Sequence, residues 1–467
     1  MNLPEAFVKR IKERELACDD VNAFLVSFDE PPVKAFHLNT AVISKESFEA
    51  CAYGRESLFF EEIEASDCAY YNKAEHIGHH PFFHAGILYS EDPSAFAVLS
   101  GLEIREGERI LDLCAAPGGK TSVLARNADK CGASILANET DRGRYKILIS
   151  NMERMGYHSV SASNLMPADL ALMYPSYFDT VVVDAPCSGE GMFRKYKDSV
   201  NEWSPENVSF CSMRQKEILE SACKCLKPGG RLIYSTCTYA TEEDEDIVRF
   251  LTDTQKMTPM DPPGFIKKYA SEEKVNGIST FKLFPHRFKG EGQFAAYLKK
   301  DGECFTDKLI HHPAAEDKGL KPLSTGQLKT LTEALGTLPD EIKGRLFFKG
   351  NNIYYLPERY IFPSKGAASD PGFLMGGMIK GRFVPSHYFF KICGRYLKTY
   401  LELSPDGPEL KAYLHGEELK EGGALKAVTD GGAFGVIKVL GVPVGGFKYA
   451  GGRIKNHYPK GLRNNKL

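Results

Sequence analysis

The chain of 467 residues is 43% hydrophobic and 26% charged, which is ordinary for a soluble globular protein. At roughly 150 residues per domain, this length predicts about three domains. The formal net charge of −2 excludes a protein that is basic overall, so a nucleic-acid partner would have to be held by local basic patches. No apolar run reaches the length of about 18 residues that a membrane-spanning helix needs, and we expect no membrane partner.

Residues 1–88 are expected to form an N-terminal α+β accessory module. Leu3, Phe7 and Ile11 recur four residues apart, which is typical of one helix face. The first 20 residues are charged and lack the apolar segment of a signal peptide, so we expect a cytoplasmic protein whose cysteines stay reduced. Clustered histidines in segment 79–84 raise a metal hypothesis, but no cysteine or carboxylate ligands accompany them. We therefore expect surface or RNA-facing histidines at a domain junction, and no metal.

From Arg109 onward the pattern changes to short apolar runs that alternate with helical stretches. Continuous apolar runs are typical of strands buried on both faces, and their alternation with helices predicts a parallel sheet covered on both sides. A further strand is expected near 290–298. Residues 89–302 are thus predicted to form an α/β domain. The runs that predict its first strands are 110–113, 134–137, 180–184 and 231–234.

The remainder of the chain is predicted to be a linker followed by two small modules. Residues 303–325 are polar and aperiodic, which indicates the linker. Residues 326–395 are expected to form an α+β module with a hairpin around Lys349-Gly350-Asn351-Asn352. Residues 396–467 are rich in glycine turns and short strands and predict a β-rich module.

A glycine-containing loop, Asp112 to Thr121, lies at a strand-to-helix turn. Ligands of open α/β sheets bind beyond the carboxyl ends of the strands, where such a loop lies, and glycine lets the backbone adopt unusual torsions and approach a ligand closely. The loop lacks the spacing of a phosphate-binding P-loop. Glu139 ends the next strand, where a carboxylate can bind both hydroxyls of a ribose. Together they predict an adenosine-containing cofactor, with Asn164 as a candidate hydrogen-bond partner of the adenine.

Two cysteines, Cys187 and Cys237, each follow a predicted strand on the cofactor side of the sheet. Carbon 5 of cytosine is a poor nucleophile, but a thiolate that adds to carbon 6 makes it able to attack an electrophilic methyl group. A second thiol could help to release the product. Asp184, at the end of its strand, is the candidate for hydrogen bonds to N3 and N4 of the ring. Methylation of an amino group needs no thiol, and the two cysteines argue against it.

These motifs resemble those of the Nol–Nop–Sun RNA cytosine-5 methyltransferases. The run Asp184-Ala185-Pro186-Cys187-Ser188-Gly189-Glu190-Gly191 is similar to the fourth motif of that family, Ser235-Thr236-Cys237-Thr238 to the sixth, and Leu113 to Thr121 to the cofactor loop. Within the family the chain most resembles the RsmF-type group, which methylates 16S ribosomal RNA near the decoding centre. The resemblance implies a Rossmann-like catalytic domain, S-adenosyl-L-methionine as cofactor and RNA as substrate.

Residue roles also follow from the resemblance rather than from the spacing, which treats the two thiols almost equally. It implies that Cys237 is the nucleophile and Cys187 assists product release. It further implies that Glu139, Asn164 and Asp184 bind the cofactor together with the loop. The family often has aspartate where Asn164 stands. The loop residues implied as cofactor contacts are Cys114, Ala115, Ala116, Pro117, Gly118, Gly119 and Lys120.

The end of the chain is basic and resembles the tail of RsmF-type proteins, whose terminal module is PUA-like. No acidic residue follows Lys438, and the aromatic residues Phe447, Tyr449 and Tyr458 alternate with the basic ones. We expect this run to contact phosphates and stack on RNA bases. The expected RNA-binding residues are Lys448, Arg453, Lys455, Lys460 and Arg463.

The sequence thus predicts an S-adenosylmethionine-dependent RNA cytosine-5 methyltransferase that acts on 16S rRNA or the 30S subunit. Two alternatives stay open at this point. One is the same chemistry on tRNA. The other, of a different class, is an RNA-binding ribosome-assembly factor without catalysis, which the intact cysteines and cofactor loop disfavour.

Overall fold

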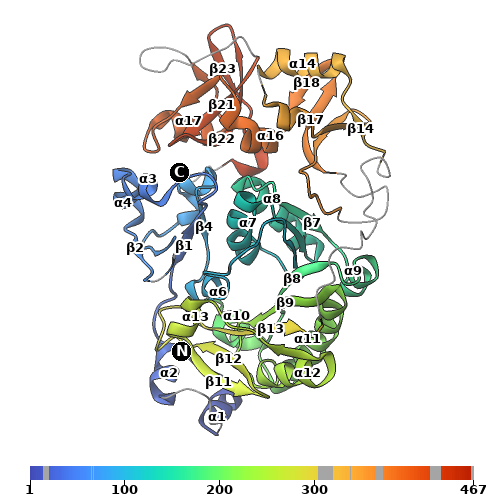
Figure 1. Ribbon diagram of the computed structural model, residues 1–467. Helices are drawn as coiled ribbons and strands as arrows, with labels where there is room; N and C mark the ends of the chain where they lie inside the picture. Colours follow the sequence, from blue (N-terminus) through green and yellow to red (C-terminus); the bar gives the residue numbers. More distant parts are fainter. Residues whose placement is uncertain are drawn as a thin grey trace.

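The computed structural model describes residues 1–13, 20–64, 66, 68–302, 319–336, 338–362, 372–420 and 433–463. Four sheets follow one another along these residues (Figure 1). The expected fold class is confirmed: an α/β domain lies between an N-terminal α+β module and β-rich C-terminal modules. Where one domain ends and the next begins remains a prediction.

The central sheet has nine strands in the order β11-β12-β13-β9-β8-β5-β6-β7, and β10 pairs with β13. The five strands from β7 to β9 are parallel, as the buried apolar runs predict. β13 joins antiparallel to β9 and extends the sheet with β10, β11 and β12. The strands are β5 (Arg109–Asp112), β6 (Ser134–Asn138), β7 (Val160–Ser163), β8 (Phe178–Asp184), β9 (Leu226–Thr236), β10 (Met257–Pro259), β11 (Ser271–Val275), β12 (Ile278–Leu283) and β13 (Gln293–Lys300).

Helices cover both faces of this sheet because successive strand residues point to opposite sides. Ile110 packs in the cluster that contains residues of α7 and α8, whereas its neighbour Leu111 packs in the cluster of α9, α11 and α12. The helices are α6 (Pro93–Ala97), α7 (Gly119–Cys131), α8 (Arg142–Met155), α9 (Pro167–Met173), α10 (Lys197–Glu202), α11 (Pro205–Cys225), α12 (Glu245–Gln255) and α13 (Gly264–Tyr269), with a 3₁₀ turn η2 at Glu190–Met192.

The N-terminal region divides between two neighbours. Helices α1 and α2 pack Phe7 and Phe24 against Phe193, Tyr239 and Phe284 of the central domain. The four-stranded sheet β2-β3-β1-β4 packs aromatic residues in an apolar cluster that also contains residues from the last part of the chain. The elements are α1 (Glu5–Glu13), α2 (Val21–Ser27), β1 (Ala35–Leu38), α3 (Lys45–Glu49), α4 (Ala52–Leu58), β2 (Glu61–Glu62), β3 (Ala69–Tyr71), η1 (Ile77–His79), α5 (Pro81–His84) and β4 (Leu88–Ser90).

Two further sheets follow. In the first, β15 and β16 form the expected hairpin, closed by the pair Lys349 and Asn352. Residues 303–318 of the expected linker lie outside the described residues, and Lys321–Pro322 form a short strand. This part contains β14 (Lys321–Pro322), α14 (Thr325–Leu335), α15 (Asp340–Lys343), β15 (Leu346–Lys349), β16 (Asn352–Tyr355), β17 (Phe373–Ile379), β18 (Arg382–Pro385), α16 (His387–Cys393) and η4 (Gly394–Tyr396).

The last sheet has the order β19-β21-β22-β23-β20 and lies beside the N-terminal sheet (Figure 1). Leu401 of this sheet and Tyr413 of α17 share one apolar cluster with Phe36 of the N-terminal sheet and with Phe82 of α5. No helix in the described parts of the chain is long and apolar enough to cross a membrane. The elements are β19 (Tyr400–Glu402), α17 (Pro408–His415), β20 (Leu419–Lys420), β21 (Phe434–Val439), β22 (Val442–Ala450), β23 (Arg453–Asn456) and η5 (Lys460–Leu462).

Candidate functional site

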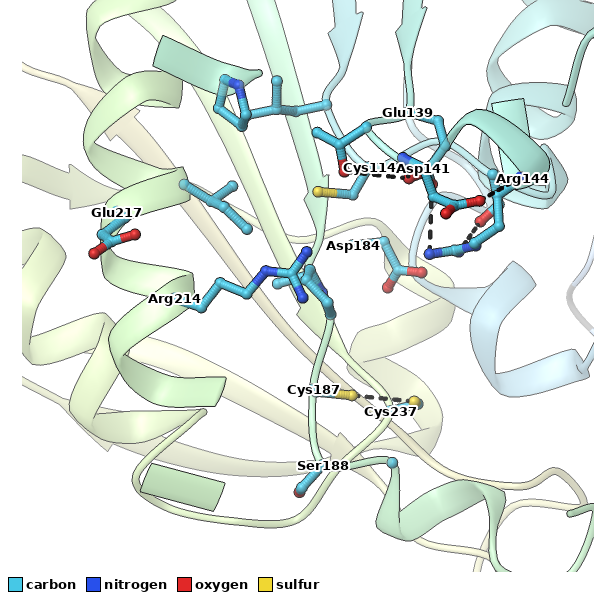
Figure 2. Close-up of a pocket in the computed structure, with 18 of the residues that line it drawn as sticks. Cys114, Glu139, Asp141, Arg144, Asp184, Cys187, Ser188, Arg214, Glu217 and Cys237 are labelled. Atoms are coloured by element: carbon cyan, nitrogen blue, oxygen red, sulfur yellow. Dashed lines mark hydrogen bonds and ion pairs between the residues drawn. The ribbon is translucent and has the colours of Figure 1, made fainter. Parts of the chain in front are cut away.

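A cavity of about 730 Å³ lies beyond the carboxyl ends of the parallel strands, where the topology of an open α/β sheet places ligands. This volume is in the range of small-molecule and cofactor sites. Figure 2 shows the cysteine pair at one end of the cavity, Asp184 near its middle, and the group of Glu139 and Arg144 at the other end. The predicted site residues that line it are Cys114, Ala116, Glu139, Asp184, Cys187 and Cys237.

The cofactor loop joins β5 to α7, and only part of it faces the cavity. Cys114 and Ala116 line it, whereas Ala115, Pro117, Gly118, Gly119 and Lys120 are not among the lining residues. Gly118 has a φ of 110° at the start of α7, so the expected unusual torsion is present. A Cβ on Gly118 would lie 2.6 Å from Met152, and one on Gly119 would lie 1.9 Å from Glu91. A side chain at either position would therefore collide with Met152 or Glu91, and the contact of these two glycines with a cofactor remains a prediction.

Asp184 is held by three hydrogen-bonding partners. Its Oδ2 lies 2.9 Å from the Lys120 Nζ, and its Oδ1 accepts hydrogen bonds from the Ser235 hydroxyl at 2.7 Å and the Gln293 amide at 3.0 Å. Burial alone would lower the pKa of Lys120, but the carboxylates of Asp184 and Glu91 raise it, so the ammonium stays charged. The charged lysine orients the Asp184 carboxylate in the cavity.

Glu139 follows β6 and is almost completely buried. Its Oε1 accepts a hydrogen bond from the Asp141 backbone at 2.9 Å, and its Oε2 lies 3.4 Å from Arg144. Arg144 also donates to the Ala116 carbonyl at 2.6 Å and so connects the carboxylate to the cofactor loop. The Asn164 side chain donates to the carbonyls of Glu139 and Thr140 at 2.6 and 2.8 Å and is not a lining residue. Asn164 thus supports the loop that carries Glu139, and its contact with an adenine remains a prediction.

The two cysteines come together although 50 residues separate them in the sequence. Their Sγ atoms lie 3.2 Å apart (Figure 2). The Ser188 and Thr238 hydroxyls lie 2.9 Å apart, and the Gly191 N–H donates to the Cys237 carbonyl at 2.8 Å. These contacts join the loop after β8 to the loop after β9. The positions of the two cysteines are therefore fixed by contacts between the two loops.

Buried carboxylates reinforce this connection. The Glu243 Oε2 accepts hydrogen bonds from the Ser188 N–H at 3.0 Å and from the Gln215 amide at 2.8 Å. Glu190 accepts hydrogen bonds from the Trp203 indole at 2.9 Å and from the Tyr239 N–H at 3.0 Å. Both carboxylates thus bridge segments on either side of the cysteine pair, which limits how far the two thiols can separate.

The surroundings of the thiols distinguish Cys187 from Cys114. The hydrogen bond to Cys237, together with burial, raises the pKa of Cys187 well above its ordinary value, so Cys187 holds its proton. Burial and the nearby carboxylate of Asp112 raise the pKa of Cys114 as well. Cys187 can therefore serve as a proton-bearing partner of Cys237, whereas Cys114 has no second thiol beside it among the described residues.

Several residues that sequence reasoning did not assign also belong to this region. Arg214, on α11, lines the cavity and reaches towards its middle in Figure 2. Gln293, at the start of β13, donates a hydrogen bond to Asp184. Its place just before a buried apolar run was the sequence feature that could have indicated it. Glu91 follows β4 and lies against Gly119, and burial raises its pKa to about 8. The sequence carried no signal that Glu91 lies near the cofactor loop, because it comes before the α/β domain's first strand.

The basic C-terminal run lies on β22, β23 and the turn that follows, far from the cavity in sequence. Lys448 and Lys455 are paired across the two strands, and both are exposed, as are Arg453 and Lys460. Arg463 is half-buried. The expectation for the aromatic residues is wrong at two positions. Phe447 and Tyr458 are buried in the apolar cluster shared with the N-terminal sheet, because their rings close the contact between the two modules, and they are not free to stack on RNA.

The clustered histidines are also different from the expectation. His80 and His84 are buried, not surface residues. His80 accepts a hydrogen bond from the Phe82 N–H at 3.1 Å and thereby begins α5, and His84 lies 3.1 Å from the Tyr458 hydroxyl. They are packing residues between the N-terminal and last sheets. No group of three or more metal-binding side chains occurs in the described residues.

Comparison with protein families finds matches along most of the chain. Residues 99–299 match the family described as 16S rRNA methyltransferase RsmB/F. Residues 3–93 match the N-terminal domain of 16S rRNA methyltransferase RsmF, and residues 331–390 match the first C-terminal domain of the RsmF rRNA methyltransferase. Residues 400–464 match the methyltransferase RsmF PUA domain.

Individual relatives carry a consistent name. The chain is 32% identical over 314 residues to the ribosomal RNA small subunit methyltransferase F of Vibrio vulnificus strain YJ016, an alignment that covers 64% of each protein. It thus spans just under two thirds of the length of that relative. The protein of the same name from Vibrio atlanticus is 28% identical over 493 residues, which covers 99% of this chain and 98% of the relative.

Solved structures share the fold of the central region. The crystal structure of NSun6 from Pyrococcus horikoshii with SFG is 18% identical, has a TM-score of 0.56, and covers 64% of this chain and 99% of that one. A methyltransferase homolog protein from Pyrococcus horikoshii is 24% identical, with a TM-score of 0.53 and coverage of 64% and 95%. At these identities the likeness concerns the fold.

Proposed function

We propose that this chain, which belongs to the RsmF-type family of Nol–Nop–Sun methyltransferases, is an S-adenosyl-L-methionine-dependent RNA cytosine-5 methyltransferase that acts on 16S ribosomal RNA through a covalent cysteine–cytosine intermediate. The observation that carries the proposal is the pair of Cys187 and Cys237, with sulfur atoms 3.2 Å apart in the same cavity as the Lys120–Asp184 ion pair. One thiol suffices to add to the ring, so a second at contact distance fits a reaction that must also release its product.

The cavity fits the cofactor by the chemistry of its lining. Glu139 offers a carboxylate for the two ribose hydroxyls, and Met166 and Ile218 offer apolar surface for a flat base. Cys114 and Ala116 line the same space from the loop, and Asp184 borders it. When bound, S-adenosylmethionine supplies an electrophilic methyl group.

The protein's own residues would prepare the cytosine. The Cys237 thiolate adds to carbon 6, and the ring's electrons move towards N3, where the Asp184 carboxyl group, when it carries a proton, can donate a hydrogen bond that stabilises the developing charge. Lys120 and Ser235 orient the Asp184 carboxylate for that contact. The target base has to leave its stack to reach the thiol at the end of the cavity.

Release of the product requires two bond changes. After carbon 5 has gained the methyl group, solvent water accepts the carbon 5 proton, the electron pair of that bond forms the double bond between carbons 5 and 6 again, and Cys237 leaves carbon 6 as a thiolate. Cys187 holds its proton and lies beside Cys237, so it can donate a hydrogen bond to the departing thiolate. This donation supports the role of Cys187 in release.

The substrate part of the proposal rests on the names of the relatives and on the exposed basic strands. The relatives are small-subunit rRNA methyltransferases. Lys448, Arg453, Lys455 and Lys460 form an exposed basic surface on the last sheet, which suits contact with phosphates. Arg463, half-buried beside Gly416, is the weakest member of the predicted set. We propose that the target cytosine lies near the decoding centre and that the protein works in the cytoplasm.

The test is methyl transfer from labelled cofactor to 30S subunits, naked 16S rRNA and bulk tRNA, followed by bisulfite mapping. We expect label at cytosines near the decoding centre and none on tRNA. Label on tRNA alone would keep the chemistry and overturn the substrate. Failure of all three RNAs to accept label, together with no covalent adduct on RNA that contains 5-fluorocytosine, would overturn the enzymatic proposal in favour of an RNA-binding assembly factor.

A further inference from the structure

Helix α11 (Pro205–Cys225) forms one wall of the cavity and presents an exposed stripe beside it. Asn207, Arg214 and Glu217 line the cavity from this helix. Phe210 lies between Asn207 and Arg214 at helical spacing and is 57% exposed, so its ring is accessible to a ligand beside the cavity. The stripe is therefore continuous with the space that contains the two cysteines.

The helix is fixed in relation to the cysteine loop. Gln215, the residue after Arg214, donates hydrogen bonds to the Pro186 carbonyl at 3.1 Å and to the Glu243 carboxylate at 2.8 Å. Pro186 directly precedes Cys187 in the loop. Arg214 therefore has a defined position relative to Cys187, with its guanidinium directed towards the middle of the cavity (Figure 2).

The charges of the lining make Arg214 distinctive. Two arginines line the cavity, Arg144 and Arg214. Arg144 is engaged by the Ala116 carbonyl and the Glu139 carboxylate. Within the described residues Arg214 has no hydrogen bond and no ion pair, and it is exposed. The other charged lining residues are the carboxylates Glu139, Asp141, Asp184, Glu202 and Glu217.

An RNA strand that delivers a base to Cys237 brings its phosphates past this acidic lining. Such a strand needs a positive group near the entrance, since phosphate contacts fix the register of a nucleic acid on its protein. A guanidinium can donate two parallel hydrogen bonds to a phosphate, and an exposed aromatic ring can stack on an unpaired base. Arg214 and Phe210 supply these two groups one helical turn apart.

We propose that the exposed stripe of α11 binds the target RNA strand next to the extruded cytosine: Arg214 binds a backbone phosphate and Phe210 stacks on a neighbouring base. This inference rests on the proposed function and adds the surface that holds the substrate. It assigns Arg214 to RNA rather than to the cofactor, although both would share the cavity.

The test measures the affinity for a naked 16S rRNA fragment around the decoding centre, as a function of salt, together with KM for RNA and for S-adenosylmethionine. We expect Arg214→Ala to weaken RNA binding about tenfold, as for the loss of a hydrogen bond to a charged group. The slope of log affinity against log salt should become shallower by about 0.7, the value for one phosphate contact of a single strand. KM for the cofactor should not change.

Two variants separate charge from stacking. Phe210→Ala should weaken RNA binding about fivefold without changing the salt slope, because stacking releases no counterions. Arg214→Lys should retain the salt slope while losing part of the affinity, because it keeps the charge and loses the planar fork. Lys224→Ala is the matched control: it removes an exposed charge from the same helix, outside the cavity lining, and should change neither quantity.

The outcomes are separable from those of the proposed function. If the wild type methylates RNA and Arg214→Ala retains its RNA affinity and salt slope, this inference is wrong and the proposed function stands. A higher KM for the cofactor with unchanged RNA binding would assign Arg214 to the cofactor and equally overturn it. If the wild type transfers no methyl group to any RNA, both fall together.

Discussion

The cavity and the basic C-terminal surface differ in how firmly their side chains are held. In the cavity, Asp184 has three hydrogen-bonding partners and the two sulfur atoms are held 3.2 Å apart by two connected loops. On β22 and β23, Lys448 and Lys455 are exposed and face solvent from neighbouring strands. Covalent chemistry needs fixed distances, whereas contact with phosphates needs charge in the right region.

This contrast indicates how each region should respond to mutation. A group fixed by several partners acts as part of one unit, so its removal should have a large effect that other residues do not replace. Exposed charges contribute to binding one phosphate at a time, so each removal should have a small, additive effect that depends on salt.

The largest effect is expected for Cys237→Ala. Without the thiol no bond to carbon 6 can form, and we expect methyl transfer to fall by at least about 1,000-fold. Single-turnover transfer from labelled cofactor measures the loss. Cys131→Ala, which removes a thiol outside the cavity, is the control and should retain wild-type activity. A Cys237→Ala enzyme with near wild-type transfer would refute the nucleophile.

Cys187→Ala should separate addition from release. We expect the variant to methylate the cytosine and then remain attached to the RNA, because the departing Cys237 thiolate has lost its hydrogen-bond partner at 3.2 Å. Denaturing gels should show an adduct that is absent from the wild type. The adduct should disappear in the Cys187→Ala/Cys237→Ala double variant. Equal adduct in the wild type and Cys187→Ala would show that Cys187 has no part in release.

The pH dependence of stability tests the buried groups around the cavity. Burial raises the pKa of Glu91 from 4.5 to about 8, so the folded state holds a proton that the unfolded state releases above pH 4.5. The bound proton therefore contributes fully to the stability of the folded state below pH 4.5, and this contribution is lost as the pH rises to about 8. We expect Glu91→Gln to be more stable than the wild type at pH 8 by roughly 4 kcal/mol, and no more stable near pH 4.5.

Thermal unfolding across this pH range measures the difference. Asp112, whose pKa burial raises to about 7, should keep part of the pH dependence in the variant. Glu103→Gln, at an exposed position, is the control and should follow the wild type at every pH. If Glu91→Gln follows the wild type as well, the carboxyl of Glu91 is not the group that titrates.

The smallest effect is expected on the C-terminal surface. Replacing both Lys448 and Lys455 with alanine should weaken RNA binding about threefold to tenfold and make the salt slope shallower by about 1 to 2, with no change in the rate of single-turnover transfer at saturating RNA. Salt-dependent binding measures both quantities. Lys411→Ala, an exposed lysine of the same module outside the basic run, is the control. A slower single-turnover rate would show that the C-terminal surface also affects the chemical step, and it would contradict the prediction.

Much of the central fold could be predicted from the sequence. Runs such as Val181-Val182-Val183 are apolar at every position because the strand is covered on both faces, and that property is visible without coordinates. The hairpin at Lys349–Asn352 follows from its local turn residues in the same way. The ends of these strands could then be placed at one edge of the sheet, which identified Glu139, Asp184, Cys187 and Cys237 as neighbours of one cavity.

Only the tertiary structure decided the rest, because it depends on contacts between residues far apart in the chain. The 3.2 Å contact of the cysteines, the support of Asp184 by Gln293 and the place of Glu91 beside Gly119 join segments whose separation leaves no periodic signal. The same holds for Phe447 and Tyr458, which look like RNA-stacking residues within a basic run but are buried by packing against the N-terminal sheet. Local pattern reports which side chains are present; packing decides whether they face solvent, substrate or one another.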